Sequence, residues 1–420
     1  MGCSSNNATS PSPADAPGVG AVDPAAVARG TRLDRRIGDL IPGFDAPFFQ
    51  AGLAGYSDAA MRLIARSLGC PYCVTEALLD RTLLAGGRGF AKADLARLRD
   101  TVPGGADDHP LAGQIMGSDP DEMADAARAM IQRNAGAPPG FSAIDVNLAC
   151  PVKKIHSKAR GGHWLAEPAG AIAILRAVRN AVPPTLPISV KMRRGSDDSA
   201  EAEHRFMTIF DAAYEIGCAW VTVHGRTVEQ KYVGPSRWTF LRDLVRRRPD
   251  RVIFGSGDVW TAEDIFRMIG YTGVHAVAVA RGCIGDPWIF RQARDMMAGR
   301  APAAPTLAEQ RAVLDGHFRL SVAVNSERRA GLLMRKFGIR FAARHRCADA
   351  VRRRFIAVTS IDEWRAVLDE FYSDGQPTHG ARPTDPSRTN RLTPNHAPPA
   401  GLRRADPACT AAGSGNRPRG

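Results

Sequence analysis

The chain has 420 residues, of which 44% are hydrophobic, and a formal net charge of +13 at pH 7. This length and composition are typical of a globular chain with a large core and exclude a small disulfide-stabilised scaffold. No run approaches the roughly 20 apolar residues of a membrane span, so we expect no membrane association. The positive charge favours a polyanionic partner, although a generic basic surface has the same charge.

Both ends of the chain lack an apolar period. Residues 1–40 are rich in Ala, Pro, Ser and Asn, and we predict a disordered leader there. Residues 375–420 are rich in Pro, Thr, Arg, Asn and Gly, and we predict a disordered basic tail. Such a tail would add weak attraction to nucleic acid, or it would be no more than a solvated end.

Between these ends, short apolar runs alternate with amphipathic stretches. The predicted strands are Pro47–Ala51, Tyr72–Thr75, Leu111–Met116, Phe141–Val146, Leu186–Met192, Trp220–Val223, Val252–Phe254 and Ala276–Ala280. The predicted helices include Ala59–Leu68, Asp119–Gln132, Pro168–Ala181, Ala202–Ile216 and Thr261–Met268. Eight such alternations predict an α/β fold, a (β/α)8 TIM barrel over residues 41–300. A doubly wound open sheet is the alternative, but no Gly-rich dinucleotide turn follows the first strand.

The eight cysteines are scattered along the chain, and no apolar signal segment precedes them. We therefore expect a reducing, cytoplasmic setting. Cys70 and Cys73 form a CxxC motif, but no second motif follows at zinc spacing. We interpret this pair as structural and predict no metal site.

Residues 305–372 are predicted to be entirely helical, with candidates at Leu307–Val324, Ala330–His345 and Ile361–Phe371. This segment has ten cations that favour phosphate contacts: Arg328, Arg329, Arg335, Lys336, Arg340, Arg344, Arg346, Arg352, Arg353 and Arg354. We expect an RNA-binding domain, and the alternative is a solvated helical face.

Chemistry-bearing residues lie at the carboxyl ends of most of the predicted strands. Because barrel active sites lie at the carboxyl ends of the strands, the coincidence predicts one site. The residues are Gln114, Asn147, Cys150, Lys191, Arg193, His224, Arg226, Ser256, Gly257, Asp258, Ala280 and Arg281. Small residues with Arg281 favour a phosphate pocket, and a lysine can stabilise negative charge on a reduced flavin. Gln114 and His224 can hydrogen-bond a flavin rim, so the set points to FMN.

From about Ala46 to Tyr372 the chain resembles the tRNA-dihydrouridine synthases. The motifs that carry this resemblance are Ile144–Asn147 with Cys150-Pro151, Ile155 and Gly161; Ala54–Asp58; Val74–Glu76; Val190–Arg193; Val223–Thr227 with Tyr232 and Gly234; Ala280–Gly282 with Gly285–Trp288; and Met334–Lys336.

The resemblance implies reduction of the C5–C6 double bond of specific uridines in tRNA, by FMN that NADPH (or NADH) reduces. Cys150 would protonate C5 as a general acid, and a thiol protonated at neutral pH suits that role. The uridine would leave its stack to reach the flavin. Asn147, Arg193 and Arg226 would hold the base, and no obligate protein partner is expected. The expected cofactor-binding residues are Gly52, Leu53, Ala54, Gln114, Lys191, His224, Ser256, Gly257, Asp258, Ala280 and Arg281. Lys153, Lys154, Lys158 and Arg160, which follow the cysteine, are expected to contact RNA phosphates.

The chain departs from the family pattern at several small residues. Gly52-Leu53 stands where Pro-Met is usual, Ala149 precedes the cysteine in place of Gly, and Ser256, Ala280 and Gly162 replace Asn, Gly and a slightly larger residue. Two alternatives remain open. One is an FMN-dependent oxidoreductase of a free pyrimidine or other small molecule, against which residues 305–372 argue. The other is a catalytically inactive tRNA-binding protein, against which Cys150, Lys191 and His224 argue.

Overall fold

The computed structural model describes residues 18–80, 84, 105–134 and 140–373. The chain divides into two compact units between Ala303 and Ala304. The predicted tail from residue 375 lies outside the described residues. No helix in the described part of the chain is long and apolar enough to cross a membrane.

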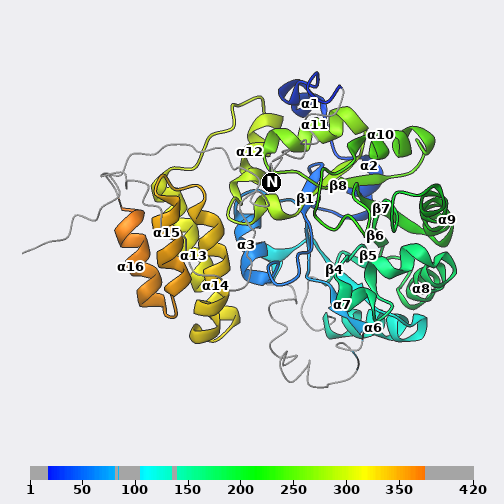
Figure 1. Ribbon diagram of the computed structural model, residues 1–420, viewed down its shortest axis with the longest axis horizontal. Coiled ribbons are helices and arrows are strands. Elements are labelled where there is room, and N and C mark those ends of the chain that lie inside the picture. Colours follow the sequence, from blue (N-terminus) through cyan, green and yellow to red (C-terminus); the bar gives the residue numbers. More distant parts are fainter. Residues whose placement is uncertain (1–17, 81–83, 85–104, 135–139, 374–420) are drawn as a thin grey trace, which may run out of the picture. The chain divides into compact units, whose positions relative to one another are not determined.

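The first unit is built around a closed parallel barrel (Figure 1). Its eight strands are β1 (Phe48–Gln50), β2 (Cys73–Val74), β4 (Leu111–Met116), β5 (Ala143–Leu148), β6 (Ile188–Arg193), β7 (Cys218–His224), β8 (Ile253–Ser256) and β9 (Ala276–Val279). Every neighbouring pair is parallel, β1 pairs with β9, and the pairing of β2 with β4 closes the barrel. A ninth, two-residue strand, β3 (Leu78–Leu79), lies beside the end of β4. The predicted (β/α)8 barrel is confirmed.

Aromatic side chains fill the half of the barrel interior at the amino-terminal ends of the strands. The Phe44 ring stacks on Tyr72 with centroids 4.6 Å apart, and Trp220 stacks on Phe254 at 5.4 Å. Phe49 packs edge-on against Tyr72. These rings come from the beginnings of their strands or just before them, so the amino-terminal half of the interior is closed by apolar packing. The carboxyl ends of the strands are thereby left as the open face.

Helices connect the strands: α3 (Ala59–Ser67), α6 (Pro120–Asn134), α8 (Pro168–Ala181), α9 (Ala200–Ile216), α10 (Trp238–Arg247), α11 (Ala262–Thr272) and α12 (Trp288–Met297). Their ends follow local rules. The Asp58 side chain accepts from the backbone N–H of Met61, and Thr261 forms a capping box with Asp264. Gly217 and Gly273 end α9 and α11 in the left-handed conformation.

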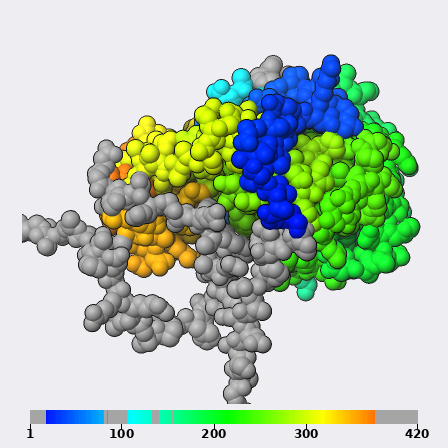
Figure 2. Space-filling model, turned by 90° about the horizontal axis from the view of Figure 1, so that it is seen from above, coloured from blue at the N-terminus to red at the C-terminus, as the bar shows by residue number. Residues whose placement is uncertain are grey.

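Residues 18–40 contain two helices, contrary to the predicted disordered leader, whose first 17 residues lie outside the described part. The helices are α1 (Pro24–Gly30) and α2 (Arg35–Leu40). The side chains of Asp23 and Asp34 cap their amino-terminal ends. Helix α1 packs on α11 and α12, and Figure 2 shows this dark blue segment lying on the green surface of the barrel. Ala28 of α1 is fully buried, and Ile37 of α2 belongs to the buried cluster around Phe44 and Tyr72. The prediction was wrong because so few buried apolar residues give no readable helical period.

The second unit is a helical bundle of α13 (Leu307–Val324), α14 (Glu327–Ala342), α15 (Ala348–Ala357) and α16 (Ile361–Phe371). Trp364 is its central side chain and packs on Phe318 and Phe355. The segment was predicted to be helical throughout, but α15 was not among the individual candidates, because the arginine run Arg352–Arg354 interrupts its short apolar pattern.

Candidate active site at the carboxyl ends of the strands

Strand register brings the predicted polar residues together. Asn147 of β5 lies opposite Lys191 of β6, and His224 of β7 lies opposite both Arg193 and Ser256. Because parallel strands share one direction, these residues share one rim of the barrel. The predicted strand ended at Val146, which placed Asn147 just beyond it. The observed strand β5 continues to Leu148, so Asn147 lies within the strand.

The loop after β5 presents Cys150. The Asn147 side-chain oxygen accepts from the backbone N–H groups of Ala149 (2.9 Å) and Cys150 (3.2 Å). The Cys150 carbonyl accepts from the N–H of Gly162 at 3.0 Å. Of the five free cysteines in the described residues, Cys150 alone is not fully buried. The loop therefore holds one accessible thiol at the mouth of the barrel.

The packing around the cysteine loop leaves no room for a side chain at Gly162. A Cβ atom there would lie 2.9 Å from the Cys150 carbonyl and 2.8 Å from a Val228 methyl group. At Gly52 a Cβ atom would lie 2.3 Å from the Thr75 carbonyl, so only glycine fits this backbone path. Two departures from the family pattern thus have a steric reason. Beside Gly52, Leu53 is half-buried and Ala54 is exposed.

A buried ion pair anchors the far end of the cysteine loop. Arg160 donates to Asp80 at 2.9 Å, and the same carboxylate accepts from the N–H of Ser118 at 3.0 Å. Both partners are almost fully buried. Arg160 is therefore not the RNA contact that we had expected, whereas Lys153 and Lys158 are exposed, and the Lys154 side chain lies outside the described part.

Replacing Arg160 by Met is expected to lower the free energy of unfolding by about 3 kcal/mol, since it removes one partner of a buried pair. Urea denaturation with a fluorescence readout measures this change. Arg128→Met is the matched control, because its pair with Asp125 is exposed and should contribute less than about 1 kcal/mol. Equal destabilisation by the two substitutions would contradict the anchoring role.

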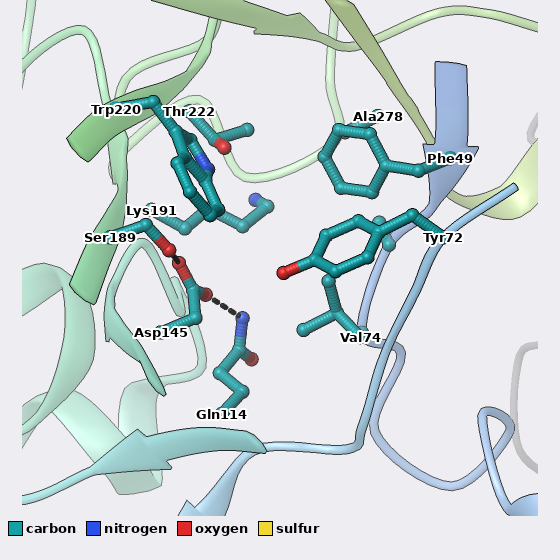
Figure 3. Close-up of a pocket in the computed structure, with 12 residues that line it drawn as sticks. Phe49, Tyr72, Val74, Gln114, Asp145, Ser189, Lys191, Trp220, Thr222 and Ala278 are labelled. Atoms are coloured by element: carbon teal, nitrogen blue, oxygen red, sulfur yellow. Dashed lines mark hydrogen bonds between the residues drawn. The ribbon is translucent and has the colours of Figure 1, made fainter. Parts of the chain in front are cut away.

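Lys191 is a half-buried cation of the site. Burial and the neighbouring Arg193 lower the pKa of its ammonium group to about 8, while Asp145 and Cys150 oppose that shift. Figure 3 shows its nitrogen pointing into a cavity that Tyr72 and Trp220 also line. The cavity volume of about 10 Å³ is about that of one water molecule. The cavity is therefore too small for any ligand much larger than water.

His224 is a neutral hydrogen-bond donor. Burial, followed by the positive charges of Arg193 and Lys191, holds the pKa of the imidazole well below its usual value. Its Nδ1 atom lies 3.1 Å from the backbone N–H of Arg226, which can only donate. The proton of the neutral ring therefore resides on Nε2.

A second cavity lies between the ends of β8 and β9. Its lining comprises His224, Ser256, Gly257, Asp258, Val259, Trp260, Ala278, Ala280, Arg281 and Gly282. The Arg281 guanidinium lies 4.9 Å from the ring centroids of both Tyr232 and Trp260. Six of the predicted cofactor-binding residues thus surround one small cavity with a cation at its edge.

Arg193 and Arg226 are held mainly by protein groups. Arg193 donates to the carbonyls of Ala149 (2.9 Å), Thr227 (2.8 Å) and Lys231 (2.7 Å), so one guanidinium braces two loops. Arg226 binds Asp258 at 2.7 Å, and its Nη1 atom has no hydrogen-bond partner among the described residues.

The CxxC motif is buried and contributes to the core. Cys70 and Cys73 have sulfur atoms 3.8 Å apart, and Cys73 belongs to β2. Within the described residues, no group of three or more histidine, cysteine, aspartate or glutamate side chains is placed to hold a metal ion.

Sequence reasoning did not place Asp145 and Ser189 in the candidate site, although both line the cavity beside Lys191. A signal existed for Asp145, since a carboxylate inside an apolar strand is rarely buried without a partner. Ser189 carried no such signal. The contact of the Trp260 ring with the Arg281 guanidinium was likewise not predictable, because it forms between two loops that are separate in the sequence.

The barrel with an accessible thiol, a half-buried lysine and a cavity edged by Arg281 on one rim defines a TIM-barrel enzyme with its candidate active site at the carboxyl ends of the strands. The chain belongs to the dihydrouridine synthase family, whose model matches residues 49–374. It is 30% identical to tRNA-dihydrouridine synthase B of Pseudomonas aeruginosa over 78% of this chain and 92% of the relative. It is also 29% identical to the Yersinia pestis synthase B (77% of this chain, 95% of the relative) and to a probable tRNA-dihydrouridine synthase of Treponema pallidum (76% and 91%).

Proposed function

We propose that this protein reduces the C5–C6 double bond of uridines in tRNA, with FMN as the bound flavin and NADPH as the reductant. Family membership and the names of the relatives support the reaction. The observation that carries the proposal is the common rim of Cys150, Lys191 and His224 beside a cationic cavity. That rim offers a proton donor, a cation and a neutral donor in one place.

The residues around the second cavity fit the phosphate of FMN. Gly257 has φ +114°, and a Cβ atom there would lie 2.3 Å from the Ser236 hydroxyl. Asp258 also has positive φ, and neither its backbone N–H nor that of Gly257 has an acceptor among the described residues. Successive N–H groups in such a turn favour an anion, and Arg281 supplies the countercharge.

Above the first cavity, the polar rim fits an isoalloxazine ring. Lys191 would balance negative charge on the reduced ring, and Gln114 and the His224 Nε2–H would bind its polar edge. The backbone at Gly52, Leu53 and Ala54 would lie beside the ring. The flavin supplies the hydride chemistry when bound.

Cys150 would donate the proton that completes saturation of the bond. Its thiol proton goes to C5 of the uracil while C6 gains the hydride, and the thiolate then regains a proton from solvent. Asn147, Arg193 and Arg226 would hold the extruded base. The unpartnered Nη1 atom of Arg226 gives this residue one donor still to use.

The helical unit, residues 305–372, would contact the tRNA backbone, and the basic tail would add attraction to it. Some of its ten predicted cations serve the unit itself, since Arg335 binds the Val358 carbonyl and Arg354 pairs with Glu370. Arg328, Arg340, Arg352 and Arg353 form no ion pair with any described residue. They are the best candidates for phosphate contacts.

The test is a direct assay. The flavin released from the purified protein is identified, and tRNA from cells that lack dihydrouridine is incubated with the protein and NADPH. We expect FMN, and dihydrouridine at a defined position. Equal activity on free uridine would favour the small-molecule alternative, whereas a colourless protein that binds tRNA would favour the inactive one.

Gly257→Ala is expected to reduce FMN occupancy by at least about tenfold, because a methyl group there clashes with Ser236 and the backbone leaves its left-handed conformation. Absorbance of the purified protein measures this loss. Gly273→Ala is the control, since this glycine also has positive φ but caps α11 away from the cavity. A similar loss of flavin in both variants would mean that folding, and not the cavity, is affected.

A further inference from the structure

Asp145 is a buried carboxylate below the candidate site, and the proposed function leaves it without a role. It lies within β5 and is 4% exposed. Register places it directly between Gln114 of β4 and Ser189 of β6. Both neighbours donate to it at 2.6 Å, and Figure 3 shows the three side chains meeting below Lys191. Burial raises the pKa of Asp145, while these two hydrogen bonds and Lys191 oppose that shift.

The carboxylate sets the direction of a chain of hydrogen bonds. Both neighbours donate to Asp145, so Gln114 turns its NH₂ group toward this acceptor. The Gln114 oxygen is then left to accept from the Asn147 NH₂ group at 2.8 Å. Asn147 lies two residues beyond Asp145 on the same face of β5.

The other end of this series of hydrogen bonds reaches the loop after β5 that holds Cys150. With its NH₂ group on Gln114, Asn147 presents its oxygen to the backbone N–H groups of Ala149 and Cys150. Those groups can only donate, so the directions set at the two ends agree. The backbone of Gln114 is itself fixed by the Thr75 hydroxyl at 2.9 Å.

We propose that Asp145 is a positioning residue that orients the amides of Gln114 and Asn147 and thereby places Cys150. The inference rests on the proposed function, because Cys150 is the group that would protonate the uracil. Asp145 is the common acceptor of the Gln114 and Ser189 donors, so its removal leaves both buried donors without this acceptor.

The first test compares the two half-reactions of the flavin-loaded Asp145→Leu protein at pH 6.5, where Lys191 keeps its proton. We expect oxidation of the reduced protein by tRNA to slow about 100-fold, since misplaced reacting groups lose that much. Reduction by NADPH uses neither Cys150 nor Asn147 and should change by less than about fivefold. Equal slowing of both, or no slowing with tRNA, would overturn the proposal.

The second test exchanges the carboxylate and the amide. Gln114→Glu alone places two carboxylates in contact and should lower both the melting temperature and dihydrouridine formation. Adding Asp145→Asn should recover the melting temperature, because the new amide at position 145 donates to the new carboxylate at position 114 and accepts from Ser189. Asp145→Asn alone should not stabilise the protein. If the two substitutions act additively, Asp145 does not set the hydrogen-bond direction.

The two kinds of failure are distinguishable. If the wild-type protein forms no dihydrouridine in tRNA, the proposed function fails. The recovery of melting temperature in the double variant still tests the hydrogen-bond direction, because that measurement uses no tRNA.

Discussion

Replacing Cys150 by alanine is expected to slow dihydrouridine formation in tRNA by about 100- to 10,000-fold, the usual contribution of a positioned general acid. Only the proton donor is removed. The loop is held by the Asn147 side chain and by the Gly162 N–H, and both bind backbone atoms of Cys150 that alanine retains. FMN occupancy and tRNA affinity should therefore stay within about twofold of wild type, as measured by absorbance and by fluorescence titration.

Cys218→Ala is the matched control, because this thiol is buried at the start of β7, far along the strand from the rim. It should keep its turnover. If Cys150→Ala protein forms dihydrouridine at the wild-type rate, Cys150 is not the proton donor. If it loses its flavin, the residue acts through folding of the site.

Replacing Lys191 by methionine is expected to slow reduction of the flavin by NADPH by about 100- to 1,000-fold, the effect of removing one preorganised electrostatic group. The wild-type rate should also depend on pH. Because burial lowers the pKa of Lys191 to about 8, the ammonium form predominates below pH 8 and is lost above it. The reduction rate should then be constant at lower pH and fall as pH rises through about 8.

Stopped-flow absorbance at a series of pH values measures both effects, and this half-reaction does not involve the Cys150 thiol. The Lys191→Met protein should lack the decline above pH 8. In the Lys191→Arg protein the cation persists, so its rate, though lowered by the different geometry, should also stay constant with pH. A decline that persists in both variants would assign it to another group.

Much of the fold was readable because strands buried on both faces appear as continuous apolar runs. All eight barrel strands were located in this way, for instance Leu111–Met116 without any shift of its ends. The alternation of these runs with amphipathic helices predicts a parallel α/β fold, and eight alternations favour a barrel. The leader helix α1 was not readable, because its burial depends on α11 and α12, which follow more than 200 residues later.

The residue types at the strand ends can be read along the chain, and they predicted a rim with a thiol, a lysine and a phosphate cavity. How each side chain is used depends on contacts that form only when the chain folds. Arg160 turned inward to Asp80, because an unpaired buried carboxylate is unfavourable. Asp145 became the origin of a hydrogen-bond chain to Cys150, because register between three strands aligned donors on both sides of an acceptor. Strand propensity is a property of neighbouring residues in the sequence, whereas hydrogen-bond partners such as these come from strands that are far apart in the sequence.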